Sequence, residues 1–481
     1  MTWHPAYRGQ VLALDYRFAG EHLLHHFIDA MTAHLDAVLA LPAHAAPAVR
    51  ERGAALRAGL VALHEEPVPV QADDVPDLYF ALQRVLEARY GDAVGLIRLG
   101  LSRNDLDMTV YKMHGRELLL DVGLRLAEVR RLLLDRARSH LDTVLIAQTH
   151  HRPGQPTTVA HYLSAVEDML ARDSERALQA YARMNRCPLG AAALAGTSHP
   201  IDRASTAAAL GFDGPVTNTY DAVASSDWEV DLAMVATSLA LDLGRFVNDL
   251  LSWAAADHYR LADDLVQGSS IMPQKRNPVA LEHARTRLSR ALGSAGMVTY
   301  SSHNIPFTDL NDFGPDIQGG LVTLHRQLGG ALELVAACLS GGDFDRGRLA
   351  QAAAATDTTA TELADVLARD AGLGFPAAHR VVADLVGRLA AEGRPLSAAT
   401  PDDLVAVGGP RLESAALAQA VDPAAFVARR AGVGMPAPAA MSGRLVRAEE
   451  RLGGDLRALR ERKDALAAAR ARLREIGKEQ V

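Results

Sequence analysis

The chain has 481 residues, of which 49% are hydrophobic and only 5% aromatic, and its formal net charge is −8. Nucleic-acid binding requires a clustered basic face, and this acidic chain has no long basic run that would supply one. The most apolar stretch, 232–241, is too short to cross a bilayer, which takes about 20 apolar residues. Residues 1–20 lack a basic segment followed by an apolar core, so we expect no secretory signal, no membrane association and a cytoplasmic location.

Cysteine use points away from disulfide and metal chemistry. Only Cys187 and Cys338 occur, and they lie in separate regions of the chain. This spacing provides neither a disulfide framework nor a metal-ligand motif, so we interpret both as packing residues. We expect no metal and no cofactor.

The predicted elements are almost all helices, because alanine and leucine dominate and β-branched runs are scarce. Apolar residues recur at helical spacing in a series of segments, in chain order 17–40, 46–64, 106–142, 157–186, 227–258 and 278–299. Polar loops rich in glycine or proline precede three of them, at 100–105, 148–156 and 268–278. The sequence therefore predicts an all-α fold in which polar loops open long helices.

Two of the long helices are apolar on more than one face, at 232–241 and, more weakly, at 279–288. A helix that is apolar on several sides must be buried on several sides, so we expect subunits to share a central helical bundle. We divide the chain into an N-terminal helical domain, 1–108, a central bundle domain, 109–354, and a smaller C-terminal helical domain, 355–481.

The charged tail, 441–481, has a leucine at every seventh position from Leu445 to Leu473. A repeat of one heptad position is weak evidence for a coiled coil, and Gly453-Gly454 interrupts it. We interpret the tail as a helix that packs one face on the C-terminal domain.

The strongest chemical signal is the loop Gly268-Ser-Ser-Ile-Met-Pro-Gln-Lys-Arg-Asn-Pro278. Lys275 can hold an anion, and Asn277 can donate to a carboxylate or a developing oxyanion. Ser269 can act as a base where nearby cationic and amide groups stabilise its alkoxide. By composition alone, an ordinary flexible loop is the competing interpretation.

The complete string resembles the signature of the aspartase/fumarase superfamily, whose members eliminate fumarate from succinyl substrates. Within it, residues 75–390 look most like argininosuccinate lyase. The matching motifs are Ser102-Arg-Asn-Asp105, Thr149-His150 with Gln155-Pro156, Pro188-Leu-Gly190, Leu194-Ala-Gly-Thr197, Pro200-Ile-Asp-Arg203, Leu210-Gly-Phe212, Asn218-Thr-Tyr-Asp-Ala-Val223 with Asp227, and Phe375-Pro-Ala-Ala-His379.

The resemblance implies a role for each matched position. Ser269 would remove a proton next to a carboxylate, and Lys275 and Asn277 would stabilise the resulting aci-carboxylate. His150 would pair with Glu282 and help protonate the leaving nitrogen. The substrate-binding residues would be Ser102, Arg103, Asn104, Thr149, Gln155 and Asn311. The family assembles such motifs from three subunits of a homotetramer, which implies composite active sites.

The sequence departs from the family where the other half of the substrate should lie. The family's His-Thr-Gly-Arg is here Arg98-Leu-Gly-Leu101, and its glutamine after the aspartate is Leu106. A Tyr-Asn-Lys-Asp-Leu-Gln-Glu-Asp-Lys stretch is here Pro306-Phe-Thr-Asp-Leu-Asn-Asp-Phe-Gly314. Loss of its last lysine removes a charge-assisted bond of about 1.5–3 kcal/mol to an amino-acid carboxylate. A substrate with a free arginine end should therefore bind poorly unless Arg98 or another cation compensates. We expect retained elimination chemistry with an altered leaving group.

The candidate leaving groups are an aminopolycarboxylate amine, as in ethylenediamine disuccinate, a diamine, a hydrazine or nitrite from nitrosuccinate. A true argininosuccinate lyase is the main alternative. A non-catalytic, crystallin-like relative would need only the tetramer. It would have no chemical need for the five residues Ser269, Lys275, Asn277, His150 and Glu282, so their presence together speaks against this alternative. A related enzyme that cleaves adenylosuccinate would need basic residues to bind the phosphate, for which Arg98 and Arg152 are candidates. The match at 188–203 nevertheless favours the argininosuccinate branch.

Overall fold

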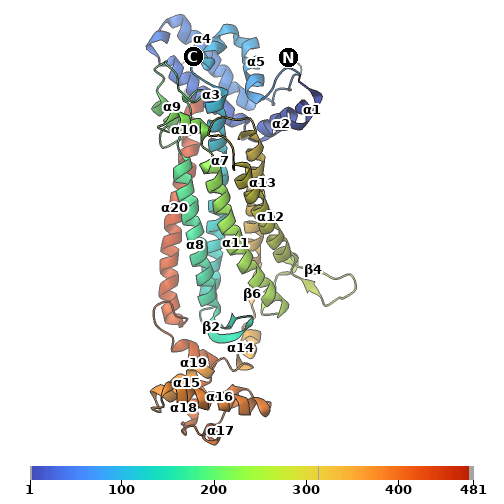
Figure 1. Ribbon diagram of the computed structural model, residues 1–481, viewed down its shortest axis with the longest axis vertical. Coiled ribbons are helices and arrows are strands. Elements are labelled where there is room, and N and C mark those ends of the chain that lie inside the picture. Colours follow the sequence, from blue (N-terminus) through green and yellow to red (C-terminus); the bar gives the residue numbers. More distant parts are fainter. Residues whose placement is uncertain (1–2, 313, 476–481) are drawn as a thin grey trace.

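The computed structural model describes residues 3–312 and 314–475, and it is elongated and mainly helical (Figure 1). A long bundle forms the middle of the molecule. Its helices are α7 (Arg103–Ser139), α8 (Val159–Met184), α11 (Asp227–Ala255), α12 (Val279–Ser301), α13 (Gly314–Gly341) and α20 (Pro438–Glu475). The predicted all-α class is confirmed, and the predicted long helices end within a few residues of the observed ones.

The N-terminal region covers one end of the bundle. It consists of α1 (Pro5–Tyr7), η1 (Arg8–Leu12), α2 (Ala13–His22), α3 (Leu24–Leu39), η2 (Pro42–His44), α4 (Pro47–Ala62), η3 (Leu63–Glu65), α5 (Leu78–Tyr90), η4 (Gly91–Val94) and α6 (Gly95–Arg98). The short helices α9 (Arg203–Ala209) and α10 (Thr219–Ala224) lie at the same end (Figure 1). The buried residues of this region belong to one hydrophobic cluster with those of the bundle, so the first two predicted domains share a continuous core.

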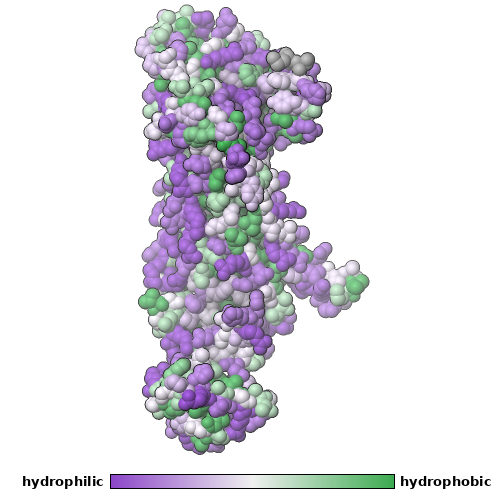
Figure 2. Space-filling model, viewed as in Figure 1, coloured by the Kyte–Doolittle hydropathy of each residue, from purple (hydrophilic) through white to green (hydrophobic). Residues whose placement is uncertain are grey.

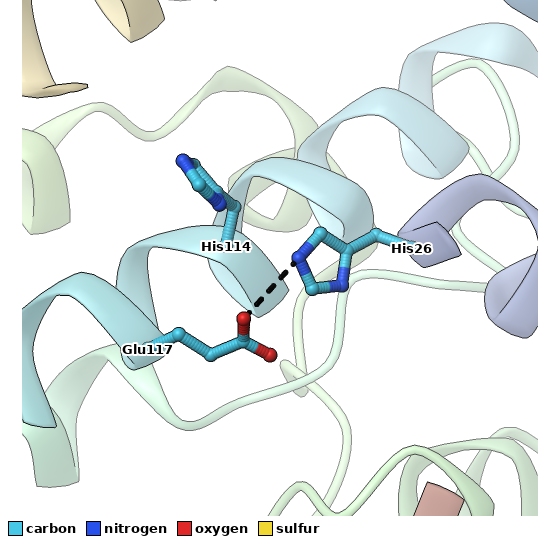
Figure 3. Close-up of side chains that lie close together, drawn as sticks. All are labelled: His26, His114 and Glu117. Atoms are coloured by element: carbon cyan, nitrogen blue, oxygen red, sulfur yellow. Dashed lines mark ion pairs between the residues drawn. The ribbon is translucent and has the colours of Figure 1, made fainter. Parts of the chain in front are cut away.

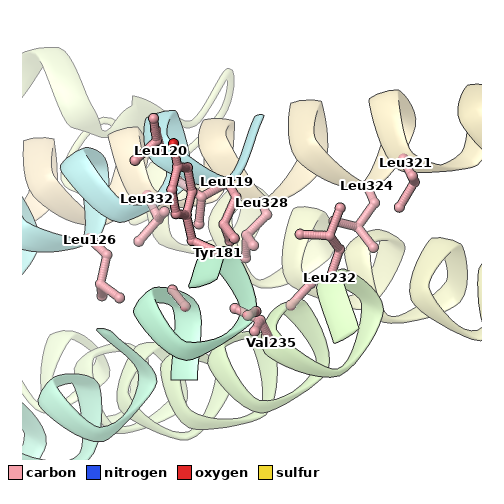
Figure 4. Packing of buried hydrophobic residues seen from close by; sticks show 14 of the residues in the cluster. Leu119, Leu120, Leu126, Tyr181, Leu232, Val235, Leu321, Leu324, Leu328 and Leu332 are labelled. Carbon is pink, nitrogen blue, oxygen red and sulfur yellow. The ribbon is translucent and has the colours of Figure 1, made fainter. Parts of the chain in front are cut away.

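Leucines from neighbouring helices interlock in the bundle core (Figure 4). Leu119 of α7, Leu232 of α11 and Leu328 of α13 are all at least nine-tenths buried. A buried guanidinium reinforces this packing, because Arg130 of α7 donates to Glu167 of α8 at 2.8 Å and to Asp455 of α20 at 2.6 Å. The arrangement leaves no charge of Arg130 unpaired in the low-dielectric interior.

Three small antiparallel sheets interrupt the helices in the part of the chain that the structure describes. They pair β1 (Val144–Thr149) with β2 (Arg152–Thr158), β3 (Tyr259–Leu261) with β6 (Gly342–Phe344), and β4 (Gln267–Gly268) with β5 (Arg276–Asn277); η5 (Asp263–Leu265) lies between β3 and β4. The predicted polar loop at 148–156 is therefore mostly a hairpin. Its turn is His150-His151, and both residues have positive φ, of 53° and 58°. Two such residues match the twist that a two-residue hairpin requires.

The C-terminal helices form a second core at the opposite end of the bundle (Figure 1). The core is built from α15 (Ala360–Arg369), α16 (Phe375–Ala391), η6 (Leu396–Ala398), α17 (Pro401–Ala406) and α18 (Ser414–Ala420). Two flanking helices, α14 (Arg346–Ala354) and α19 (Pro423–Ala428), contact the β1–β2 hairpin.

The tail differs from our expectation, because α20 runs back along the bundle and packs on α7 and α8 instead of on the C-terminal domain. Its leucines belong to the bundle core. Residues 476–481 of the predicted tail lie outside the described residues.

The surface of the bundle mixes hydrophilic and hydrophobic residues (Figure 2). Most of the apolar run in α11 is buried within the chain, whereas Met234 and Leu241 are 48% and 53% exposed. None of the helices in the described ranges is long and apolar enough to span a membrane.

Candidate active site

The first predicted motif forms the start of α7. Ser102 is the N-cap residue, and with Asp105 it makes a reciprocal capping box. Such a box satisfies backbone N–H groups that the first helical turn leaves without partners. The Ser102 hydroxyl also contacts the side-chain oxygen of Asn104 at 2.8 Å. Capping thus fixes the position of Arg103 and Asn104 at the junction of the N-terminal region and the bundle.

Asp105 connects this motif to a second stretch of the family pattern. Its carboxylate accepts hydrogen bonds from the backbone N–H groups of Gly190 and Ala192 at 2.8 and 2.9 Å. Gly190 has a φ of +88°, and a Cβ there would lie 2.6 Å from the Cγ of Arg203. Burial raises the pKa of Asp105 to about 6 although these bonds oppose the shift. Asp105 therefore has a structural function at this junction.

A cavity of about 290 Å³ lies beside Arg103, between the N-terminal helices, the start of α7 and residues 309–311 and 314–315. The Arg103 guanidinium donates to Asp77 at 3.1 Å and to the side-chain oxygen of Asn311 at 2.5 Å. Its Nε also lies 3.6 Å from Asp107. The stretch that departs from the family pattern thus packs directly on the motif predicted to hold the succinyl group.

Two other departures do not reach this cavity. Leu106 is completely buried and packs in the core, so its side chain cannot replace a substrate-binding glutamine. Arg98 pairs with Glu87 at 3.2 Å and does not line the cavity. Compensation for the lost lysine by Arg98 therefore stays a prediction that this cavity does not support.

Thr149 and His150 lie at the opposite end of α7, where the β1–β2 hairpin turns. Both side chains are exposed, as is that of Gln155, which donates to Thr361 at 3.2 Å. No hydrogen bond or ion pair among the described residues joins His150 to Glu282. The predicted pairing of these two residues is not made within one chain.

The loop that carries Ser269 projects from the side of the bundle, beyond the short β4–β5 pair (Figure 1). The Ser269 hydroxyl accepts a hydrogen bond from the backbone N–H of Met272 at 3.1 Å. Lys275 is exposed, and Ile271 at the tip is 83% exposed. Asn277 ends β5, and Glu282 follows in the first turn of α12, with its side chain exposed.

One chain does not bring the three groups of predicted residues together. The 37 residues of α7 separate Ser102 from the Thr149 hairpin by about 55 Å, at about 1.5 Å per residue. The Ser269 loop leaves the bundle at a third place (Figure 1). The predicted site residues stay candidates, because their convergence would require more than one chain.

A different cluster has a composition that suits a metal. His26 of α3 faces Glu117 of α7 at 3.6 Å, and His114 lies beside them (Figure 3). Arg470 pairs with Glu117 from the other side. Burial, followed by the charge of Arg470, holds the pKa of His26 well below its ordinary value. The positive charge of Arg470 would repel a metal ion at this position. We therefore interpret the cluster as a polar contact between α3, α7 and α20.

The sequence interpretation missed three acidic residues that line the cavity beside Arg103: Asp15, Asp77 and Asp107. Asp107 follows the matched motif by one helical turn from Arg103, a spacing that places both side chains on one face. Asp15 and Asp77 come from separate elements, and no local pattern indicated them.

Comparison with known proteins agrees with this architecture. Residues 60–293 match the lyase family model, and residues 357–428 match that of the argininosuccinate lyase C-terminal region. Argininosuccinate lyase of Natronomonas pharaonis is 38% identical over 405 residues, 82% of this chain and 80% of that protein. Argininosuccinate lyase 2 of Agrobacterium fabrum is 34% identical, with 77% and 76% covered.

Solved structures share this fold over most or all of the chain. EDDS lyase in complex with formate has a TM-score of 0.82 and 27% identity, and the match covers 100% of this chain and 98% of that one. A 3-carboxy-cis,cis-muconate lactonizing enzyme from Pseudomonas putida, at 20% identity and a TM-score of 0.70, shares the fold. The chain belongs to the argininosuccinate lyase-like branch of the aspartase/fumarase superfamily, and it is a carbon–nitrogen lyase of the fumarate-releasing type.

Proposed function

We propose that this protein is a cytoplasmic homotetramer that cleaves an N-substituted aspartate to fumarate and an amine, with a leaving-group pocket unlike that of argininosuccinate lyases. The base removes a proton from the carbon next to one carboxylate. The C–N bond electrons leave with the nitrogen, which takes up a proton, and a C=C bond forms. The reverse reaction adds an amine to fumarate.

In this proposal Ser269 is the base, and Lys275 and Asn277 stabilise the aci-carboxylate by charge and hydrogen bonding. His150 and Glu282 form an acid pair for the leaving nitrogen. The succinyl carboxylates are held by Ser102, Arg103, Asn104, Thr149 and Gln155. Closure of the exposed Ser269 loop over substrate would exclude water and bring its backbone N–H groups close to the reacting atoms.

Composite sites are supported by the separation of the candidate groups along α7, since no folding of one rigid bundle can close about 55 Å. A symmetric assembly of antiparallel bundles places the end of one α7 beside the opposite end of another. The exposed Met234 and Leu241 lie seven residues apart on α11 and so share a helix face that a neighbouring bundle would cover.

The contact between Arg103 and Asn311 is the observation that best supports an altered leaving-group pocket. Asn311 lies in the stretch that lacks the family's tyrosine and final lysine. Its side-chain oxygen accepts a hydrogen bond from one terminal nitrogen of the Arg103 guanidinium. Among the described residues that line the cavity, Arg103 is the only cation. A leaving group that ends in an amino-acid carboxylate would find no cation there that is free of carboxylate partners among the described residues. The 38% identity to an argininosuccinate lyase nevertheless keeps argininosuccinate as the second candidate substrate.

The test is fumarate release from argininosuccinate, ethylenediamine disuccinate and nitrosuccinate, each followed by ultraviolet absorbance, with the Ser269→Ala variant as the blank. We expect slow or no release from argininosuccinate and faster release from another N-substituted aspartate. Fast release from argininosuccinate alone would contradict the altered pocket and identify the chain as a true argininosuccinate lyase. No release from any succinyl compound would favour the crystallin-like alternative.

A further inference from the structure

The cavity beside Arg103 is strongly acidic. Within the described part of the chain, its lining contains four carboxylates and one guanidinium and no lysine or histidine. The carboxylates come from four separate places in the chain, namely Asp15, Asp77, Asp107 and Asp309. These residues converge on one enclosed space only through the tertiary fold.

The single cation of the lining is already neutralised. Arg103 is held by Asp77 at 3.1 Å and by Asp107 at 3.6 Å, and its other arm donates to Asn311. Asp15 and Asp309 form no ion pair among the described residues, although the charge of Arg103 and a hydrogen bond from Asn104 partly offset the raised pKa of Asp309. A further anionic group in the cavity, beyond the succinyl half held at the Ser102–Asn104 motif, would meet this excess of negative charge at short range.

The carboxylates of the lining resist ionisation. Burial raises the pKa of Asp15 to about 6, and the nearby Asp316 adds to the shift. Burial also raises the pKa of Asp107 and of Asp309, and Asp77 and Asp309 reinforce the shift of Asp107. A positive charge in the cavity would relieve this repulsion and favour the ionised forms.

The uncharged part of the lining also suits an organic cation. Trp3, Tyr7, Phe18 and Tyr111 supply aromatic surface, and aromatic rings attract ammonium and guanidinium groups. Tyr111 is only 5% exposed, and its hydroxyl makes no hydrogen bond to the described residues. That hydroxyl can accept a hydrogen bond from a ligand, as the carboxylates can. A buried polar group without a partner is costly unless a ligand or water satisfies it.

We propose that this cavity binds a leaving group with a second positive charge and no carboxylate, such as the far ammonium of an α,ω-diamine. The inference rests on the proposed function, in which the adjacent Ser102–Asn104 motif holds the succinyl half of the same substrate. The preferred substrate is then an N-(aminoalkyl)aspartate, which gives fumarate and a diamine.

Amine addition to fumarate tests the preference with matched compounds. Diamines of two to five carbons are compared with the monoamine and the ω-amino acid of equal length, by loss of fumarate absorbance. For the best length, we expect kcat/KM to be at least about tenfold higher for the diamine than for the monoamine, because one charge-assisted contact distinguishes them. The ω-amino acid should react more slowly still. Equal or faster reaction of the monoamine or the ω-amino acid would overturn the proposal.

Variants assign the preference to this cavity. Asp309→Asn and Tyr111→Phe should each reduce the ratio of diamine to monoamine kcat/KM, by about tenfold for the carboxylate and less for the neutral hydroxyl. Asp312→Asn is the matched control, because Asp312 is exposed in the same segment and does not line the cavity. An unchanged ratio in Asp309→Asn, with the fold retained by circular dichroism, would contradict the assignment.

Calorimetric titration separates this proposal from the proposed function. The intact protein is titrated with the best diamine of the series and with the matched monoamine, without fumarate. Diamine binding that weakens in Asp309→Asn, in a protein without lyase turnover, would support the cavity and overturn the proposed function. Turnover of succinyl compounds without diamine binding and without a diamine preference would agree with the proposed lyase function. It would contradict the proposal that this cavity binds a diamine.

Discussion

At the scale of single residues, Ser269 has a near-identical neighbour that serves as its control. Both Ser269 and Ser270 lie in the projecting loop, and Ser269 alone accepts backbone hydrogen bonds there, from Ile271 and Met272. These bonds orient the Ser269 oxygen and favour its negative charge.

We predict that Ser269→Ala lowers kcat by about 10²–10⁴-fold, the range for loss of a general base, whereas Ser270→Ala has a small effect. Fumarate release measures both. Near wild-type turnover in Ser269→Ala would remove the serine from the mechanism.

Asp105 shows how one buried carboxylate connects distant parts of the motif set. It accepts backbone hydrogen bonds from Ser102 as well as from Gly190 and Ala192. Asp105→Ala should lower the free energy of unfolding by about 3 kcal/mol or more, because buried donors lose their acceptor. Asp105→Asn keeps an oxygen and should cost less. Urea denaturation distinguishes the two, and equal costs would argue against this explanation.

At the scale of elements, α20 is held to the bundle by its row of leucines. Leu459 is 4% exposed, and a Cβ at Gly123 of α7 would lie 2.8 Å from its Cδ2. Leu459→Ala should therefore cost about 2–5 kcal/mol, the range for large-to-small changes in a core. Val446→Ala, at a 52% exposed position of the same helix, should be nearly neutral. Chemical denaturation would contradict the packing if both cost the same.

A buried histidine of α7 makes the stability of the fold depend on pH. Burial lowers the pKa of His114 to about 4, with His22 and His325 adding to the shift. Between pH 6.5 and 4 the unfolded state therefore binds a proton at this position that the folded state does not. The free energy of unfolding falls as the pH falls, by up to about 3 kcal/mol from this group.

The raised pKa values of Asp15 and Asp105 act in the opposite direction over the same range, so the comparison must be made between variants. In His114→Phe, we expect the loss of stability from pH 6.5 to 4 to be smaller than in the wild type. His199→Phe, at an exposed position, should leave the pH dependence unchanged. Parallel pH profiles for His114→Phe and wild type would refute the assignment.

At the scale of the whole molecule, the composite site predicts complementation. Ser269→Ala and His150→Asn should each be inactive, and asparagine tolerates the positive φ of position 150. Mixed tetramers made by co-expression at equal levels should recover about a quarter of wild-type activity, because two different subunits must each supply an intact residue. No recovery would place both residues in one subunit. Light scattering should give four times the 51.3 kDa chain mass.

The sequence by itself determined the helical class, the positions of the long helices and the family, because these depend on composition, local periodicity and contiguous motifs such as 268–278. It also indicated the altered stretch at 306–314. It could not indicate that Asp105 is a structural link, since its partners lie about 85 positions away.

Only the tertiary structure decided where the tail packs and what lines the cavity. The leucine repeat of α20 defines an apolar face but not the surface that covers it, because hydrophobic burial is not directional. Asp15, Asp77 and Asp309 lie far apart in the sequence, and only the packing of the N-terminal helices against α7 and α13 brings them to one space. Electrostatic repulsion among them depends on distance, a quantity that local sequence patterns do not contain.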